Sequence, residues 1–558
     1  MKSTSTWFAL RNPVFCRIWL ASVLSGTFLS AQDMSATWLM HDLGASSLSL
    51  SLMATAASAP FFLFTLPAGA VADIVSRRAL VVIALLWQGA CSAFLAFGAW
   101  ARAIDPGAVL GCIFALGIGL AFGAPVLGAI VPDIVDKEEL PSAITLGGVQ
   151  LNLSGIVGPA LGGLLLPVLG APFPISVNAL MFLVVVFAVL QWKPRPTHLA
   201  GLRENFLESL VSSLRYARNS RRMRVILFRN LLFSVIISIV PALLPVIALK
   251  ELHLSATQLG FVFTCVGIGS LAGAVFALPF LRRRISSNAI MSISMAILVQ
   301  VLIALAFMRQ PPSLMVCAAF AGMAWALAGA ELWVAGQRVM PGWVRGRMNS
   351  FQIVLGQGSI ALGALLWGSG IAHVGPELTF GAAAVLAIGV LALGHRFSIN
   401  FAAEASVDAA PIHPRYAFPF CPNSDDGPVT IAIEYSIARE NRERFYALMQ
   451  EVQATIRRNG AFRCRLDESL DRPGLFRLEY LVSTWAEYLR QSMRMTVDET
   501  QVFNTVLDMH LGDSRPIVRY YLSTQKCLIV NEFGFTGRTF SNASSVASAS
   551  SSSVSSPV

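Results

Sequence analysis

Twelve long apolar runs occupy the first 400 residues of this chain, and they constrain its fold more than any other feature. A helix rises 1.5 Å per residue and the hydrocarbon of a bilayer is about 30 Å thick, so about twenty apolar residues can cross it. Because a bilayer offers no water, the backbone of each crossing must bond to itself, which predicts helices. We expect spans at 14–40, 46–72, 79–101, 107–131, 142–169, 173–192, 225–249, 257–280, 286–308, 313–336, 348–371 and 377–397.

The composition places the chain among membrane proteins. Of its 558 residues, 55% are hydrophobic and only 13% are charged, whereas soluble domains are about one quarter charged. The net charge of +10 does not indicate nucleic-acid binding, because the cations flank the apolar runs. The eight cysteines form no Cys-x-x-Cys pair, so neither a zinc site nor a disulfide framework is predicted. We therefore expect no metal and no cofactor.

The lysines and arginines gather in alternate gaps between the runs. One side holds only Arg102, Lys250 and Arg309. Cytoplasmic loops are enriched in Lys and Arg, so the other side is predicted to be cytoplasmic together with both termini. That side contains Lys2, Arg11, Arg17, Arg77, Arg78, Lys137, the cluster at 193–229, Arg282–Arg284, Arg338, Arg345 and Arg347.

The spans divide into an N-terminal lobe at 1–192 and a C-terminal lobe at 225–400, joined by a cytoplasmic linker at 193–224. Apolar residues recur every four positions in that linker, which predicts an amphipathic helix lying along the anionic inner leaflet. Two six-span halves are typical of secondary transporters, whose substrate site lies between the halves. The apolar positions of the linker helix are Leu202, Phe206, Leu210 and Leu214.

The composition changes after Asn400. We expect a proline-containing linker at 401–428, a soluble domain at 429–523 and a disordered Ser-rich tail at 524–558. Within the domain, alternation at 429–435 predicts a strand, followed by a helix that ends at Gly460. Strands at 461–470 and 475–482, a helix opened by a Thr484–Glu487 capping box and continuing to His510, and a strand at 517–522 complete the pattern. The order β-α-β-β-α-β predicts a ferredoxin-like α+β fold.

The gap after the second span has a pattern of its own. Gly69 is followed by Asp73 and then by Arg77 and Arg78, and this resembles the loop signature of the major facilitator superfamily. The resemblance implies a conformational gate: Gly69 allows close helix approach, and the charges lock and release helix ends. The family usually has Arg directly after the Asp, whereas this chain has Ile74. Alternatively, the two arginines only set topology.

Two further stretches extend the resemblance. The gap after span eight repeats the pattern without its Asp, through Gly273, Pro279 and Arg282–Arg284. Span five resembles the Gly-Pro signature of the exporting antiporters, with Ser154 where the signature often has Gly. Ordinary small-residue packing explains the same residues equally well. The signature residues are Gly155, Gly158, Pro159, Gly162 and Gly163.

A broader resemblance identifies a branch of this superfamily. The stretches 131–135 and 138–143, and the loop at 341–347 with Arg345, Gly346 and Arg347, resemble the transmembrane secretion effectors, which include enterobactin exporters. This implies an all-α membrane protein of twelve helices in two lobes, the major facilitator fold, carrying an appended α+β domain. It also implies an exporter in the inner membrane of a bacterium.

Polar groups inside the spans are candidate substrate or proton sites. Asp33 lies toward the outer end of span one and Glu331 in the inner part of span ten. A carboxylate is costly inside a bilayer, so each is a functional hypothesis by default. The alternatives are a headgroup-level position for Asp33 and a salt bridge to Arg338 for Glu331. Neutral candidates for the cavity lining are Gln150, Asn152 and Gln357.

The C-terminal domain resembles the antibiotic-biosynthesis monooxygenase type of dimeric α/β barrel. His510 is the one histidine of its folded part, so a self-association or regulatory role is favoured over catalysis. The leading hypothesis is a non-enzymatic, proton-coupled exporter of a lipophilic or siderophore-like solute. The alternatives are an importer or facilitator on the same scaffold, and a transporter fused to an enzyme that modifies its cargo.

Overall fold

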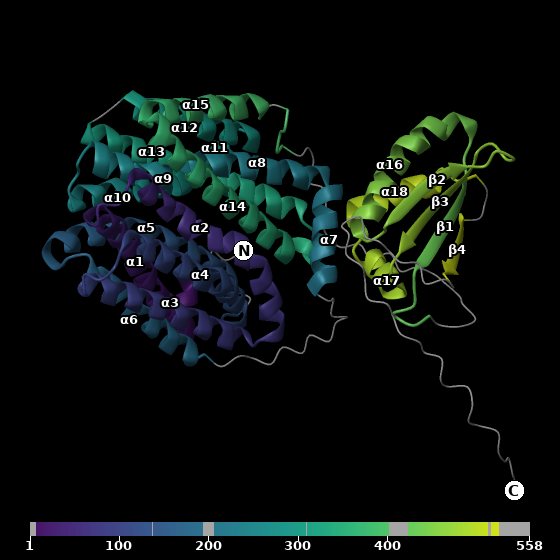
Figure 1. Cartoon of the computed structure of the whole chain (residues 1–558). Coiled ribbons are helices and arrows are strands. Elements are labelled where there is room, and N and C mark those ends of the chain that lie inside the picture. The colour runs from purple at the N-terminus through teal and green to yellow at the C-terminus, as the bar shows by residue number, and fades with distance from the viewer. Residues whose placement is uncertain are drawn as a thin grey trace, which may run out of the picture. The chain divides into compact units, whose positions relative to one another are not determined.

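The computed structural model contains two compact units, residues 1–407 and 408–558, which are described separately. Its first unit is helical, and its second contains a four-stranded sheet (Figure 1). The structure describes residues 7–136, 138–192, 206–307, 310–394, 396–400, 422–511 and 515–523, and the expected Ser-rich tail and most of the proline-containing linker lie outside these ranges.

The described residues contain twelve helices or helix groups that are long and apolar enough to cross a membrane, as the sequence predicts. Those of the N-terminal lobe are α1 (Pro13–Asp42), α2 (Ser47–Ile74), α3 (Arg77–Trp100), α4 (Pro106–Ile134), α5 (Leu140–Leu169) and α6 (Pro172–Leu190). Most begin where a short side chain bonds to the first free backbone N–H groups, as Asn12, Ser46, Ser76 and Asp105 do.

Two spans of the C-terminal lobe are interrupted near prolines. Span seven consists of α8 (Arg221–Ile237), α9 (Ile239–Val246) and the π-turn η2 (Ile247–Glu251), and span eight of α10 (Ala256–Ala272), η3 (Gly273–Ala277) and α11 (Leu278–Arg282). A proline has no N–H to donate, so the α-helical bonding pattern breaks around it. The remaining spans are α12 (Ser287–Phe307), α13 (Pro311–Val339), α14 (Gly342–Val374) and α15 (Pro376–Leu393).

The start of α14 corrects one prediction. The expected loop carrying Arg345, Gly346 and Arg347 is the first part of this helix, which begins six residues before the expected span. No proline lies between Gly342 and Asn349, so the charged residues extend α14 beyond its apolar stretch.

The linker helix α7 (Phe206–Asn219) is present, and its described side chains begin at Ser213. Tyr216 and Ala217 pack into a cluster with residues of α8 and α14, and the Tyr216 hydroxyl donates to the Val339 carbonyl at 2.9 Å. Of the predicted apolar face, Leu214 is half-buried, and Leu202 and the side chains of Phe206 and Leu210 lie outside the described residues. The last turns of α7 therefore pack on the C-terminal lobe.

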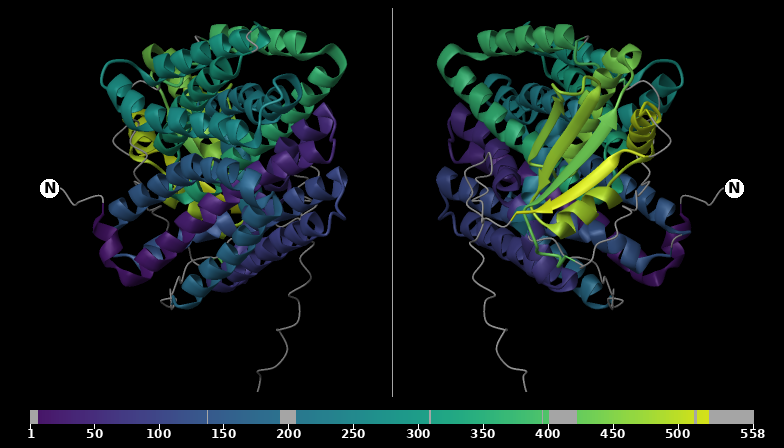
Figure 2. Two further views of the ribbon diagram at one scale, coloured as in Figure 1. Left: turned by 90° about the vertical axis from the view of Figure 1, so that its left-hand side faces the viewer. Right: turned by 90° about the vertical axis from the view of Figure 1, so that its right-hand side faces the viewer.

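The C-terminal module, residues 422–523, has the predicted ferredoxin-like order. Its strands β1 (Val429–Ser436), β2 (Arg463–Glu468), β3 (Leu475–Val482) and β4 (Ile517–Leu522) form an antiparallel sheet in the order β2-β3-β1-β4. Figure 2 shows these strands side by side, with β4 in yellow at one edge. The helices are α16 (Arg442–Asn459), α17 (Trp485–Met493) and α18 (Val497–Asp508).

The last predicted helix of the module is in fact two. Thr484 caps α17 by accepting from the Glu487 N–H, but the Glu487 side chain pairs with Arg490 and Arg494 instead of completing the box. A full capping box at Thr496 opens α18. The sequence Thr496-x-x-Glu carried this signal, which the prediction missed.

One face of the sheet is buried beneath the helices, and this determines which residues stabilise the module. Leu478 is fully buried in its core, whereas Arg477 lies on the opposite face of β3. Burial also raises the pKa of the Cys464 thiol to about 11, which makes it a poor nucleophile in the native state.

We therefore expect Leu478→Ala to destabilise the module by about 2–5 kcal/mol, the usual cost of such a core truncation. In a chain whose only cysteine is Cys464, thiol labelling should accelerate at least about 30-fold, because labelling requires the module to open. Arg477→Ala is the matched control and should label at the parental rate. Equal rates in the two variants would contradict the assigned faces.

Candidate functional site

The two lobes meet mainly along two pairs of helices, and one pair is α2 with α14. We call the end of the bundle with connections 43–46 and 101–105 end A, and the end with connections 75–76 and 135–139 end B. A Cβ added to Gly368 would lie 1.9 Å from the Ser51 hydroxyl, and one added to Gly358 would lie 2.4 Å from the Phe62 ring. The Thr55 hydroxyl donates to the Ala361 carbonyl at 3.0 Å. These contacts extend from the end A terminus of α2 to its middle.

The second pair is α5 with α10, and it contains the predicted Gly-Pro motif. A Cβ on Gly260 would lie 2.8 Å from the Gly163 Cα and from the Pro159 carbonyl oxygen, so the two backbones touch. The Thr257 hydroxyl donates to the Gly163 carbonyl at 3.1 Å. Deeper in the bundle, a Cβ on Gly267 would lie 2.6 Å from the Gly155 carbonyl oxygen. We call these contacts the glycine seam.

The rest of the Gly-Pro motif faces the other way. A Cβ on Gly158 would lie 2.5 Å from the Thr27 carbonyl oxygen, and one on Gly162 would lie 3.1 Å from the Ala31 carbonyl oxygen, both on α1. The motif therefore holds α5 against α1 of its own lobe and against α10 of the other. Small residues are required on both sides of the helix because both neighbours approach its backbone.

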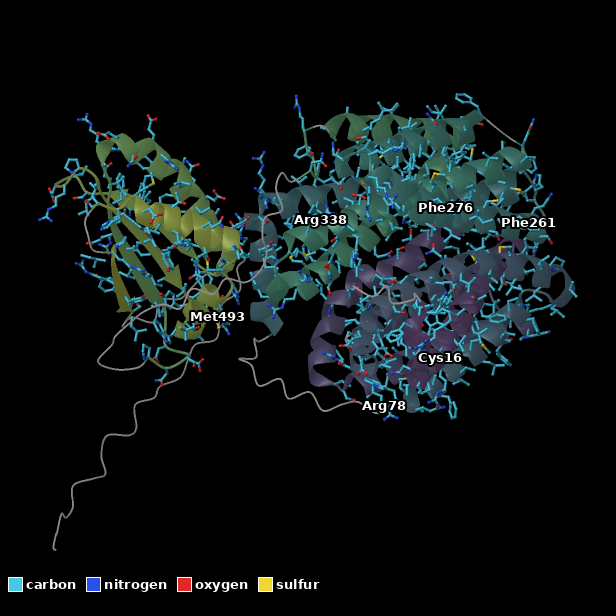
Figure 3. The ribbon with its side chains drawn as sticks, turned by 180° about the vertical axis from the view of Figure 1, so that it is seen from behind. Cys16, Arg78, Phe261, Phe276, Arg338 and Met493 are labelled. Carbon is cyan, nitrogen blue, oxygen red and sulfur yellow. The ribbon has the colours of Figure 1, made fainter. Side chains whose placement is uncertain are left out.

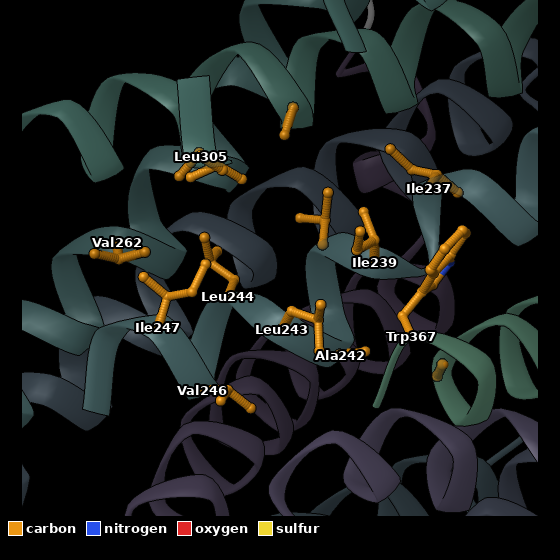
Figure 4. Close-up of a cluster of buried hydrophobic side chains, with 14 of the residues drawn as sticks. Ile237, Ile239, Ala242, Leu243, Leu244, Val246, Ile247, Val262, Leu305 and Trp367 are labelled. Carbon is orange, nitrogen blue, oxygen red and sulfur yellow. The ribbon is translucent and has the colours of Figure 1, made fainter. Parts of the chain in front are cut away.

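The hydrophobic cores of the lobes join at end A and are separate at end B. One cluster contains Leu50 and Ile175 of the N-terminal lobe together with Leu243, Val262 and Trp367 of the C-terminal lobe. Figure 4 shows the part of this cluster that the C-terminal lobe contributes, largely from α9 and the helices around it. Among the described residues, the core clusters at end B each belong to one lobe. The packing between the lobes is therefore asymmetric along the bundle.

The predicted gate residues lie at end B. Arg77 forms an ion pair with Asp133 at the end of α4, at 3.1 Å, and Arg78 donates to the Leu190 carbonyl at the end of α6. A Cβ on Gly69 would meet nothing within 4 Å, so the expected close approach is absent in this conformation. The side chain of Asp73 lies outside the described residues. The arginines thus tie the helix ends of the N-terminal lobe together.

The C-terminal lobe has an ion pair of its own. Glu331 of α13 is 1% exposed, and its Oε1 accepts from Arg282 Nε of α11 at 2.7 Å. The expected alternative partner, Arg338, is exposed and forms no ion pair with a described residue. Figure 3 labels Arg338 and Arg78 on different lobes. The basic run at 282–284 was the sequence signal for the true partner, but sequence could not pair residues 49 positions apart.

Asp33 lies on the inner face of α1. Leu29, one turn earlier, packs against the core of the N-terminal lobe, whereas Leu24, on the opposite side of the helix, is 49% exposed. Asp33 is exposed although its neighbours Gln32 and Met34 are buried. Its carboxylate forms no ion pair with a described residue. Asp33 therefore presents an accessible carboxyl group toward the interior of the bundle.

The neutral candidates differ in their surroundings. Gln150 donates to the Ser22 carbonyl of α1 at 3.2 Å, and Asn152 donates to the Gly148 carbonyl of its own helix at 2.8 Å. Gln357 is half-buried and forms no hydrogen bond with a described residue. In the module, His510 Nδ1 accepts from the Ser436 N–H at 2.9 Å, which gives this histidine a structural role.

The glycine seam predicts a conformational effect of added bulk. Gly260→Val forces the α5 and α10 backbones apart, and overpacking of this kind costs about 1–3 kcal/mol. We expect the population closed at end A to fall about 5- to 150-fold relative to the other conformation. Cross-linking of a Thr55→Cys/Ala361→Cys pair in a cysteine-free background measures that population.

The control is Gly147→Val, on α5, where a Cβ meets nothing within 4 Å. It makes the same change in helix propensity, so its cross-linking should remain at the parental level. Equal cross-linking of the Gly260 and Gly147 variants would mean that the seam does not hold end A closed.

The buried ion pair predicts a pattern among charge variants. Arg282→Gln leaves the Glu331 carboxylate buried without its cation, so the purified protein should unfold at a lower temperature. Arg282→Gln/Glu331→Gln should recover most of this loss, because the isolated buried charge is the main cost. Arg283→Gln, at an exposed neighbour, is the control. Equal unfolding temperatures for the single and double variants would contradict this account.

Comparison with known proteins agrees with this architecture. The sequence profile of the transmembrane secretion effector family matches residues 4–527. The chain is 25% identical over 414 residues to the multidrug efflux pump Tap of Mycobacterium tuberculosis, spanning 72% of this chain and 96% of that protein. It is 25% identical over 268 residues to the enterobactin exporter EntS of Citrobacter koseri, spanning 47% and 63%. Macrolide efflux protein A of Streptococcus pyogenes is 23% identical over 254 residues, spanning 44% and 63%.

Solved structures share the fold of the helical unit. The nucleoside transporter NupG aligns with a TM-score of 0.55 at 12% identity, over 69% of this chain and 98% of that one. A bacterial homologue of the lysosomal transporter Spinster aligns with a TM-score of 0.54 at 15% identity, over 69% and 97%. Because the family profile spans nearly the whole chain, the protein belongs to the transmembrane secretion effectors, a family of multi-pass major facilitator transporters.

Proposed function

We propose that this protein is a secondary active exporter that moves a lipophilic solute by alternating access. The observation that carries the proposal is the asymmetric packing of the lobes, which are joined at end A and separate at end B. Family membership and the three relatives named as efflux or export proteins support the direction. Drug-like and siderophore-like solutes are the proposed classes.

The direction of the opening follows from the charges. Lys and Arg gather in the gaps at end B, so we place end B and both termini in the cytoplasm of a bacterium, with the spans in its inner membrane. On this orientation the structure is closed toward the outside. The lobes then separate at the glycine seam and approach each other at end B, and the site between them becomes accessible from the other side.

The charged groups divide into two roles. The Arg77–Asp133 pair lies within the N-terminal lobe and the Arg282–Glu331 pair within the C-terminal lobe. The lobes can therefore move relative to each other without breaking either pair. The carboxylate of Glu331 is occupied by Arg282, and we assign this residue to lobe stability instead of coupling. Asp33 is accessible and forms no ion pair with a described residue, and we assign to it the binding of a proton or of a cationic solute group. Gln150, Asn152 and Gln357 remain proposed lining residues.

The C-terminal module is proposed to act in self-association. Its ferredoxin-like sheet leaves one face open, and ion pairs such as Arg519–Glu434 and Arg477–Glu479 lie on that face. The resemblance of its sequence to dimeric α/β barrels supports this role. No residue cluster that could hold a metal occurs among the described residues.

Transport in everted membrane vesicles tests the proposal. Solutes that a deletion strain retains are supplied outside the vesicles, and their uptake is followed while the pH gradient is imposed and then collapsed. Uptake that depends on the gradient supports proton-coupled export. Uptake that is unchanged by collapse rejects proton coupling, and accumulation only in right-side-out vesicles rejects export.

Asp33→Asn tests most directly whether Asp33 couples transport to the proton gradient. The amide cannot take up a proton at physiological pH, so gradient-driven accumulation should fall at least about tenfold while downhill equilibration of the solute continues. Glu251→Gln changes an exposed carboxylate at end A and should leave accumulation unchanged. Full gradient-driven accumulation by Asp33→Asn would remove this residue from the coupling mechanism.

A further inference from the structure

One buried positive charge in the C-terminal lobe lacks an anionic partner. Five charged side chains are buried among the described residues, and four of them form ion pairs. The fifth is Arg229 of α8, which is 7% exposed and forms no ion pair with a described residue. A guanidinium is always charged in proteins, so Arg229 is a buried cation without compensation. The four paired side chains are Glu331, Glu487, Arg494 and Glu499.

Neutral groups hold the Arg229 side chain in place. Its Nη1 donates to the Asn288 Oδ1 at the start of α12 and to the Phe397 carbonyl after α15. A Cβ on Gly394 would lie 3.2 Å from Nη2, so the missing side chain of this glycine leaves room for the guanidinium. Nε and Nη2 form no hydrogen bond with a described residue and are not fully enclosed. The guanidinium is therefore fixed between three helices, with donors still available at the surface.

The C-terminal lobe has no free carboxylate near Arg229. The acidic residues between positions 213 and 400 are Glu251, Glu331 and Glu377. Glu251 and Glu377 lie at end A, whereas Arg229 lies about two turns after the start of α8 at end B. The Glu331 carboxylate already accepts from Arg282. A buried charge without a partner is costly, so the structure favours a counter-anion from outside this part of the chain.

An exposed surface of rings and arginines lies beside the guanidinium. Phe228 precedes Arg229 and is 40% exposed, and its ring lies 5.2 Å from the ring of Phe397, which is 37% exposed. Arg224 is exposed one turn before Phe228, and Arg396 is exposed directly before Phe397. Aromatic rings and arginines at the ends of spans are typical of the headgroup level of a bilayer. The free donors of Arg229 therefore lie where phospholipid phosphates are within reach.

We propose that Arg229, with Arg224 and Arg396, binds the phosphate of an anionic phospholipid headgroup. The planar guanidinium fork matches phosphate oxygens, and the two exposed arginines favour a headgroup with a net negative charge. A free phosphate ion shares this chemistry, but the exposed rings of Phe228 and Phe397 favour a ligand that also carries acyl chains. The bound lipid joins α8, α12 and α15 at end B, whichever way the lobes move solute.

Thermal unfolding of the purified full-length chain in detergent micelles tests this assignment. Dioleoylphosphatidylglycerol should raise the unfolding temperature of the parent chain in a saturable way, because a ligand of the folded state stabilises that state. Dioleoylphosphatidylcholine has the same phosphate and acyl chains but no net charge, and it should raise the unfolding temperature much less. In Arg229→Gln the apparent affinity for phosphatidylglycerol should fall at least about fivefold, the effect of one arginine near an anionic lipid.

Two further variants serve as controls. Arg11→Gln removes an equal charge from an exposed position at end B of the other lobe and should bind phosphatidylglycerol as the parent does. Arg229→Lys retains the charge and should bind more tightly than Arg229→Gln. This comparison separates the loss of the charge from the loss of the bonds to Asn288 and Phe397.

Three outcomes would overturn the proposal. If the two lipids stabilise the parent chain equally, the site does not select a negative headgroup, and this comparison needs no variant to fold. If inorganic phosphate displaces phosphatidylglycerol from the parent, the site takes the free ion and not a lipid. If Arg229→Gln unfolds at a lower temperature without lipid but keeps the parental affinity for phosphatidylglycerol, Arg229 only ties the three helices together.

Discussion

The absence of a hydrophobic driving force between helices in lipid is the constraint on which this structure depends. Lipid tails are as apolar as leucine, so helices associate through close van der Waals contact and hydrogen bonds. The glycine seam meets this requirement, because Gly163 and Gly260 bring two backbones into contact. Hydroxyls on the same helices, such as Thr257 and Thr55, bond to carbonyls of the opposite lobe. The contact between lobes is therefore local and breakable.

Two ion pairs, in contrast to the glycine seam, lie inside the lobes and not between them. Arg77 pairs with Asp133 inside the N-terminal lobe, and Arg282 pairs with Glu331 inside the C-terminal lobe. A buried charge that loses its partner is costly, so these pairs favour lobes that move as units. The linker helix α7 follows the same rule, since Tyr216 fixes its last turns to the C-terminal lobe. Among the contacts described, these two ion pairs lie within the lobes, whereas the glycine seam and its hydroxyl bonds lie between them.

Much of the fold could be predicted from the sequence, and the candidate site only in part. Apolar runs specify spans directly, and the alternation at 429–435 specifies a strand with one buried face. The start of α14 was predicted too late, because charged residues continue a helix beyond the membrane as readily as they end one. The partner of Glu331 was missed, because chain distance says little about spatial distance. The role of Gly69 also depends on the conformation, since its neighbours differ between states.

The sequence by itself determined that twelve helices cross a bilayer and that a βαββαβ module follows, because hydropathy and periodicity act locally along the chain. Only the tertiary structure decided which end of the bundle is packed, which carboxylate is paired and which remains accessible. It also brought Glu331 and Arg282, which are far apart in the sequence, within ion-pair distance. These properties depend on contacts between distant segments, and such contacts exist only once the chain has folded.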